Sequence, residues 1–182
     1  MFILDWLTNS PLLLRKLLLI FLILPSLIGF SQVNYDSLWT VWEDQSNADS
    51  VRFSAIHNYA FSLSYQDPDS CEKVALIELE WSKSIKNKKY EANALNVIGI
   101  SYYYRGNYET TKKYWNAALE IRESINDREG MAASYNNIAN LHISLSEYDP
   151  AIKHLEKCIE IDKEDGNKDG MAASYNNLGI IH

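Results

Sequence analysis

Histidines are the first side chains to consider for metal chemistry, because imidazole is a common zinc ligand. The chain has four, at His57, His142, His154 and His182, and no two of them have the spacing of an H-x-x-x-H or H-E-x-x-H pair. Since a second ligand is missing at each, we predict no metal site. His142 and His182 fall at equivalent positions of the repeat pattern described below, and we expect both to pack between helices.

The only two cysteines, Cys71 and Cys158, are the next candidates for chemistry. No His or Asp lies at an offset typical of an activated thiol, so a nucleophile is not predicted. In the repeat pattern they fall two hairpins apart, whereas a disulfide needs Cα atoms within about 7 Å. We expect two free thiols that act as small buried apolar side chains.

Acidic side chains are numerous, and two carboxylates held together could perform acid–base catalysis. Those in the second half stand near expected helix ends and loops, where solvated faces explain them better. Phosphate-binding glycine loops and G-x-S-x-G elbows are missing from the sequence. We therefore predict no catalytic residue, no cofactor and no enzyme within residues 1–182. The carboxylates concerned are Glu120, Glu123, Asp127, Glu160, Asp162, Glu164 and Asp165.

The composition is that of a soluble protein, with 47% hydrophobic and 23% charged residues among 182. A formal net charge of −7 disfavours nucleic acid as a partner, because phosphate binding needs clustered Lys and Arg. An anionic membrane surface is disfavoured for the same reason.

One short stretch organises the chain, because it occurs twice. Residues 130–137 read G-M-A-A-S-Y-N-N, and residues 170–177 read the same. Self-similarity with a period of 20–50 residues is typical of stacked repeat arrays. We therefore predict an all-α solenoid of antiparallel helical hairpins.

The N-terminus has the order of an export signal. Arg15 and Lys16 precede an apolar run over residues 17–30, and Gly29 and Ser31 supply small residues for cleavage after Ser31. The run contains Pro25 and is too short for a membrane span, which needs about 20 residues. We predict a signal peptide over residues 1–31, cleaved in preference to retained as an anchor.

Residues 32–49 are polar apart from a short cluster around Trp39 and Trp42, which we expect to cap the first hairpin. From Ser50, apolar residues recur at helical spacing up to the break at Asp67-Pro68-Asp69. Asp69 or Ser70 is expected to cap the next helix. We predict hairpin repeats over 50–182, with units at 50–89, 90–129 and 130–169 and a partial unit at 170–182.

The unit at 90–129 contains Leu95, the Ile98-Gly99 pair, Tyr102 and the turn Gly106-Asn107-Tyr108. In these residues the repeats resemble the tetratricopeptide family. The resemblance implies a right-handed superhelix in which small residues mark close helix crossings and tyrosines fill gaps between hairpins. Glu78 departs from the pattern, since it occupies a small-residue position. The signature positions are Gly99, Tyr102, Gly106, Tyr108, Ala118, Ala139, Tyr148, Ala151, Cys158 and Gly179.

The same resemblance implies a concave groove lined by the first helix of each hairpin, which binds a protein or peptide. Asn96, Asn136 and Asn176 would form a ladder with one amide per repeat, able to pair with a peptide backbone. An alternative is that these amides only tie helices together. Lys and Arg are missing from the groove positions, so capture of an acidic C-terminus is not expected. These positions are Asn93, Asn96, Ile100, Tyr103, Tyr104, Ala133, Asn136, Asn140, Ile143, Ser144, Ala173, Asn176 and Ile180.

The expected function is an exported interaction scaffold. The Trp-containing entry segment followed by 40-residue repeats resembles the front of bacterial signalling proteins that carry a nucleotide cyclase or histidine kinase after a membrane helix. We therefore expect the sensory or docking region of a longer protein, located in the periplasm or at the cell surface. The alternative is a free-standing adaptor without an effector. Membrane association would come only from an uncleaved signal or from a segment beyond His182.

Overall fold

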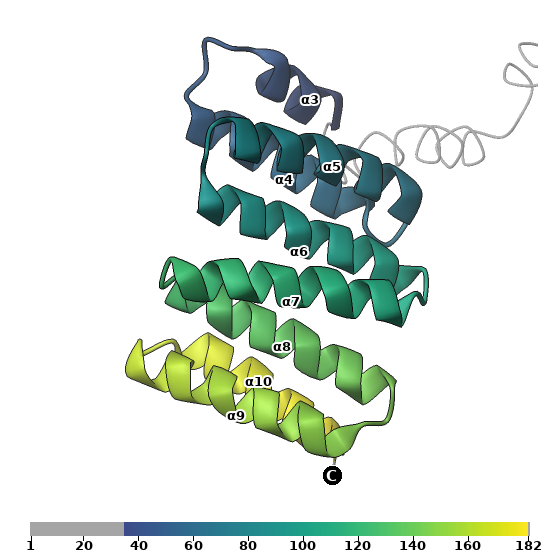
Figure 1. Cartoon of the computed structure of the whole chain (residues 1–182), viewed down its shortest axis with the longest axis vertical. Coiled ribbons are helices and arrows are strands. Elements are labelled where there is room, and N and C mark those ends of the chain that lie inside the picture. Colours follow the sequence, from purple (N-terminus) through teal and green to yellow (C-terminus); the bar gives the residue numbers. More distant parts are fainter. Residues whose placement is uncertain (1–34, 182) are drawn as a thin grey trace, which may run out of the picture. The chain divides into compact units, whose positions relative to one another are not determined.

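The computed structural model describes residues 35–181, and the residues from Asp36 onward form one compact unit. The predicted all-α fold of stacked helical hairpins is confirmed, and Figure 1 shows each helix packed on the next along the chain. The predicted signal peptide, 1–31, lies outside the described residues. The helices are α3 (Tyr35–Glu43), α4 (Asp49–Leu63), α5 (Pro68–Ser84), α6 (Lys88–Tyr104), α7 (Tyr108–Ser124), α8 (Arg128–Ser144), α9 (Tyr148–Glu164) and α10 (Lys168–Ile181).

One turn recurs after each helix from α5 to α9. A residue with positive φ stands at 86, 106, 126, 146 and 166, so the turns are evenly spaced along the chain. After each of them an amide donates to the carbonyl five positions back, as Asn107 does to Tyr102 at 3.0 Å. This is a helix end closed by a left-handed residue. Because α5 to α9 share one length and are joined by links of equal length, two helices and two links make up the 40-residue period.

The first hairpin turns differently, and here one prediction was wrong. The N-cap of α5 is Asp67, whose carboxylate accepts from the Ser70 amide at 3.1 Å, and not Asp69 or Ser70. Pro68 is the first helical residue. It fits there because the first amides of a helix have no partner within the helix and proline has no amide hydrogen to lose.

A very close helix crossing lies between α6 and α7. A Cβ atom added at Gly99 would overlap the indole of Trp115, which is only 3% exposed. The indole Nε1 donates to the Asn96 carbonyl at 3.1 Å, so the ring is held against the bare backbone of α6. In the next hairpin Ala139 and Leu155, both fully buried, take the places of Gly99 and Trp115. Where the first helix has the larger residue at the crossing, Ala139 in place of Gly99, the second helix has the smaller side chain, Leu155 in place of Trp115.

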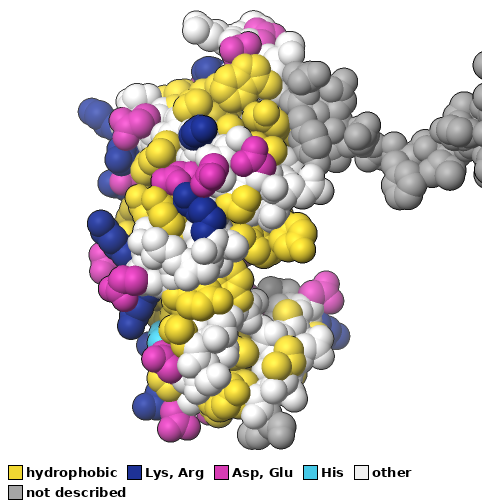
Figure 2. All heavy atoms as spheres, turned by 90° about the vertical axis from the view of Figure 1, so that its right-hand side faces the viewer, with side chains coloured by type: hydrophobic (Ala, Val, Ile, Leu, Met, Phe, Trp, Pro, Cys, Tyr) yellow, Lys and Arg dark blue, Asp and Glu magenta, His cyan; other side chains and the backbone are white. Residues whose placement is uncertain are grey.

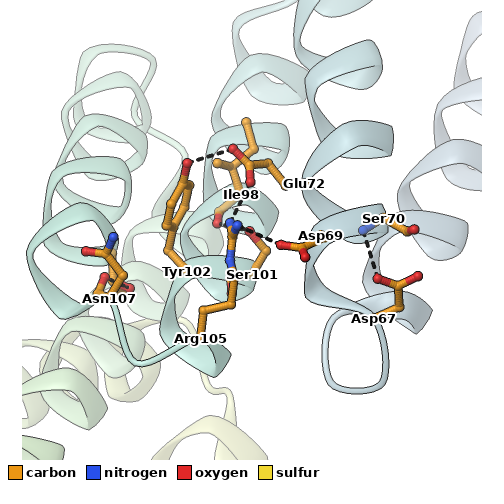
Figure 3. Close-up of polar contacts among 10 residues, drawn as sticks. Asp67, Asp69, Ser70, Glu72, Ile98, Ser101, Tyr102, Arg105 and Asn107 are labelled. Carbon is orange, nitrogen blue, oxygen red and sulfur yellow. Dashed lines mark hydrogen bonds and ion pairs between the residues drawn. The ribbon is translucent and has the colours of Figure 1, made fainter.

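Polar contacts join the first hairpin to the second, between α5 and α6 (Figure 3). Tyr102 donates to Glu72 at 2.7 Å, and Arg105 contacts Glu72 at 2.6 Å and Asp69 at 2.9 Å. The Arg105 guanidinium also lies 4.1 Å from the centre of the Tyr102 ring. Burial acts to raise the pKa of Glu72, but the hydrogen bonds from Tyr102 and Arg105 hold that pKa below its usual value.

Glu78, which departs from the repeat pattern, is fully buried in α5. Its Oε1 lies 2.9 Å from His57 Nδ1 on α4, and its Oε2 has no hydrogen-bond partner among the described residues. Burial raises the pKa of Glu78, while the contact with His57 opposes that rise. The unusual residue thus pairs the two helices of the first hairpin through a polar contact where the pattern expects a small apolar one.

The short helix α3 covers the start of the array. Trp42 is 8% exposed, and its ring lies edge-on to that of Trp81 at 5.0 Å. Arg52 fixes this contact, because its Nε donates to the Trp42 carbonyl at 2.9 Å and its guanidinium lies 4.8 Å from the Trp42 ring. The two tryptophan rings are thus used in packing.

The other signature positions divide into buried and exposed. Ala118, Ala151 and Cys158 are buried in the second helices, as small residues at a crossing require. Tyr148, by contrast, is 46% exposed and does not fill a gap between hairpins, so that prediction was wrong. The view that Asp162 is solvated was also wrong: it is 3% exposed and accepts from Asn167 at 2.8 Å.

The helix crossing at Gly99 gives the first prediction. Gly99→Ala should lower the free energy of unfolding by about 1–3 kcal/mol, because the added methyl group must displace a buried indole. The measurement is urea unfolding followed by circular dichroism. Gly179→Ala is the matched control, since no atom of the described residues lies within 4 Å of the added Cβ. This control should leave stability unchanged or raise it slightly through better helix propensity. Equal effects of the two substitutions would contradict this account of the crossing.

Candidate functional site

A hollow lies on the face formed by the first helices. It has a volume of about 330 Å³ and receives side chains from α4, α6, α8 and α10, with one ring from α7. Figure 2 shows an indentation bordered by hydrophobic side chains at the right-hand edge of that view. The lining residues are Phe61, Ile100, Tyr103, Tyr104, Trp115, Asn137, Asn140, Ile143, Ser144, Asn177 and Ile180. We call this site the central hollow.

Most of the lining of the central hollow was expected from the sequence as groove positions, namely Ile100, Tyr103, Tyr104, Asn140, Ile143, Ser144 and Ile180. They come from α6, α8 and α10, so equivalent positions of successive repeats are brought side by side. The hydroxyls of Tyr103 and Ser144 share a hydrogen bond of 2.7 Å, which joins α6 to α8 at the rim.

Two members of the expected amide ladder, Asn96 and Asn136, accept hydrogen bonds from other first helices. The Asn137 amide donates to the Asn96 side-chain oxygen at 2.8 Å, and Asn177 donates to Asn136 in the same way at 2.7 Å. These two bonds join consecutive first helices, which is the role of tying helices together that the sequence left open. Asn176 is exposed and does not line the central hollow. Binding of a peptide backbone by this ladder stays a prediction.

Asn93 and Asn136 lie outside the central hollow. Asn93 accepts from Arg122 at 2.9 Å, and both line a hollow of about 190 Å³ near the start of α8. Arg122 is 4% exposed and also donates to Ser134 at 2.6 Å, so its charge is used in joining α7 to the first helices. Burial lowers the pKa of Arg122. Asn136 lines a similar hollow beside Cys158, with Ala133 and Ala173.

Four residues of the central hollow were missed from the sequence: Phe61, Trp115, Asn137 and Asn177. Trp115 belongs to a second helix and reaches the groove only because Gly99 leaves room for its ring. Asn137 and Asn177 each follow an expected groove residue by one position. The Asn-Asn doublet at the end of the repeated octapeptide could have indicated that the second Asn also faces the groove.

The central hollow is electrically neutral, since none of its lining residues carries a formal charge. Aromatic and isoleucine side chains supply most of the lining. Asn140 lies between Ile100 and Ile180 in the 40-residue register, and its half-buried side-chain amide makes no hydrogen bond within residues 35–181. That amide can donate and accept in an otherwise apolar surface.

The groups considered first for chemistry are placed away from this hollow. Cys71 and Cys158 are free and buried, and burial raises the pKa of the thiols to about 12 and about 11, well above the range of a reactive thiolate. The His142 and His154 rings stack at 5.5 Å, and burial lowers the pKa of His154. Within residues 35–181, no group of three or more His, Cys, Asp or Glu is placed to hold a metal ion.

The tetratricopeptide repeat family model matches residues 90–164, which span α6 to the end of α9. These residues are therefore similar to tetratricopeptide repeats, which generally mediate protein–protein interactions and are typically non-catalytic scaffolds. The chain matches no curated protein. Among the described helices, none is long and apolar enough to cross a membrane.

The amide pairs between consecutive first helices give the second prediction. Asn137→Ala should lower the free energy of unfolding by about 1–2 kcal/mol, because it removes a hydrogen bond and leaves the Asn96 oxygen without its donor. Asn140→Ala is the matched control on the same helix, as its amide is unpaired, and should change stability by less than about 0.5 kcal/mol. Both are measured by urea unfolding. If Asn140→Ala proved as costly as Asn137→Ala, the assignment of the pairs would be contradicted.

Proposed function

We propose that this chain is an interaction scaffold whose central hollow binds an uncharged, largely apolar peptide segment of a protein partner. The observation that carries the proposal is the unpaired amide of Asn140 within a neutral lining of rings and isoleucines. An apolar side chain of the partner would bury surface against Ile100, Ile143 and Trp115. A peptide group of the partner would pair with Asn140, which removes the cost of leaving that amide unsatisfied.

The neutral lining also supports selection against charged partners. Moving an unpaired carboxylate or ammonium group into this hollow would cost desolvation energy with no opposite charge to offset it. This is consistent with the absence of Lys and Arg from the expected groove positions. The chain would therefore recognise an internal apolar segment in preference to a charged terminus.

The wider proposal concerns where the scaffold works. We infer that it is the exported docking or sensory region of a longer signal-transduction protein. This rests on the order of positive residues, apolar run and small residues in 1–31, and on the resemblance of the entry segment and repeats to bacterial signalling proteins. The partner peptide would then be met outside the cytoplasm.

A peptide selection tests the site. A displayed library of short random peptides panned against the chain should yield uncharged sequences with an apolar or aromatic anchor. Asn140→Ala should weaken these peptides about tenfold, the equivalent of one well-made hydrogen bond in a partly buried site. Ile143→Asp should abolish binding, because it places a charge in the hollow. Affinities are measured by fluorescence anisotropy.

The control for this experiment is Lys153→Ala, an exposed change on α9 away from the hollow. Its affinities should equal those of the wild type. Selected peptides that bind Ile143→Asp as tightly as the wild type would show that they bind elsewhere. Peptides that are predominantly acidic would overturn the proposed specificity.

Export has its own test. Residues 1–31 fused to a reporter enzyme that is active only outside the cytoplasm should confer activity on bacteria that express the fusion. Replacing Arg15 and Lys16 by Glu should reduce that activity strongly, since the positive step precedes the apolar run in an export signal. N-terminal sequencing of the exported product should begin at Gln32. Reporter activity that stays at the level of an unfused control would contradict the export proposal.

A further inference from the structure

Two neighbouring hairpins contain the same pair of stacked rings at equivalent positions. Between α6 and α7, the rings of Tyr102 and Tyr114 stack with their centres 5.6 Å apart. One 40-residue period later, between α8 and α9, the stacked rings are those of His142 and His154, with centres 5.5 Å apart. Two tyrosines thus meet the packing need of this position, whereas two histidines add groups that titrate near neutral pH. We call the second pair the histidine stack.

The surroundings of His154 do not favour a positive charge. Its Nδ1 is buried and has no hydrogen-bond partner among the described residues. From α8, the rings of Tyr135 and His142 both stack on it. On its own helix, Lys157 adds a second positive charge to the cluster, with its ammonium 5.0 Å from the Tyr135 ring. The described part of α10 also packs on α9, but none of its charged groups acts on His154.

His142, the other ring of the stack, has a partner for a proton. Its Nδ1 lies 2.6 Å from a carboxylate oxygen of Glu147, which stands directly before α9. A positive charge on His142 is therefore compensated by a carboxylate. A second positive charge, on His154, would face the first across the stack, and like charges at this distance repel strongly in a partly buried site. The histidine stack thus accommodates one positive charge and not two.

The titration of His154 agrees with this geometry. Burial lowers the pKa of His154, and the neighbouring His142 and Lys157 lower that pKa further. The folded chain therefore binds fewer protons at this ring than the unfolded chain does. Stability that depends on the neutral ring is fully present above the ordinary pKa of histidine, about 6.5, and is lost as the pH falls below that value.

We propose that the histidine stack is an acid-sensitive joint, which holds α8 against α9 at neutral pH and loosens when both of its rings take up protons. The equivalent pair between α6 and α7 keeps its neutral rings over the same range, because tyrosine loses its proton only near pH 10. A pH-dependent hairpin therefore follows a hairpin that is closed by an uncharged pair. The joint acts within the chain, so it does not depend on what the central hollow binds.

The matched variant copies the tyrosine pair into the third unit, as His142→Tyr together with His154→Tyr. Urea unfolding is measured from about pH 7.5 to about pH 5.5, where the ordinary carboxylates stay charged. Over this range the unfolding constant of the wild type should rise about tenfold more than that of the variant. His57 and Glu78 are the same in both proteins, so their titration cancels. Equal pH dependence of the two proteins would overturn the proposal.

A second measurement follows the rings directly and does not depend on the folding of the tyrosine variant. Nuclear magnetic resonance titration of the wild type should give His154 a pKa below 6.5. Lys157→Gln should raise that pKa, because it removes a positive neighbour, while Lys153→Ala, an exposed change on the same helix, should leave it unchanged. A pKa of His154 at or above 6.5 contradicts the joint.

Hydrogen exchange locates the effect in the array. Exchange rates, corrected for their intrinsic pH dependence, should increase at least about tenfold on acidification in α8 and α9, and by less in α6 and α7, because each unit of a repeat array has its own stability. An increase that is equal in both hairpins would place the acid effect outside the histidine stack and overturn the proposal. Peptide binding by the central hollow is not a readout in any of these experiments, so their failure leaves the proposed function untouched.

Discussion

The left-handed turn that closes one helix after another at a constant interval determines the rest of this structure. Because the turn and the helix length hardly change from α5 to α9, equivalent positions of successive repeats always face the same neighbours one unit further on. The helix crossings and the amide pairs follow from that register. So does the alignment of Ile100, Asn140 and Ile180 along one face. The turn does not always need a glycine: Lys86, Asn126 and Ser146 adopt the left-handed conformation as well, so the array bears a small local strain at these turns.

Within that register, side-chain size decides how closely the helices approach and where the hollow forms. Gly99 admits the Trp115 ring, which brings a residue of a second helix into the lining of the central hollow. Two guanidinium groups lie outside the hollow and join helices: Arg105 contacts α5 from α6, and Arg122 contacts the start of α8. The structure thus places these ionic and charged contacts at helix junctions and leaves the hollow neutral.

The sequence was sufficient for the fold, because the repeated octapeptide fixes the period and the small residues fix the hairpin crossings. It placed most of the lining of the central hollow, since the first helices share one motif. The sequence did not show which of Asn136 and Asn137 lines the central hollow. Adjacent residues on a helix point about 100° apart, and only packing shows that Asn137 lines the central hollow, that Asn136 does not, and that both form hydrogen bonds with a neighbouring first helix. The burial of Asp162 was missed for a similar reason, as a helix end can face either solvent or the next hairpin.

The uniform turn has a consequence at the level of the gene. Two identical stretches, 130–137 and 170–177, begin at the same point of two structurally equivalent helices. Recombination between the DNA segments that encode them would add or delete one whole repeat unit. Every remaining helix would keep its length and its turn and would face the equivalent helix of another unit. Arrays of this kind can therefore change length in a single genetic step, and with it the extent of the surface offered to partners.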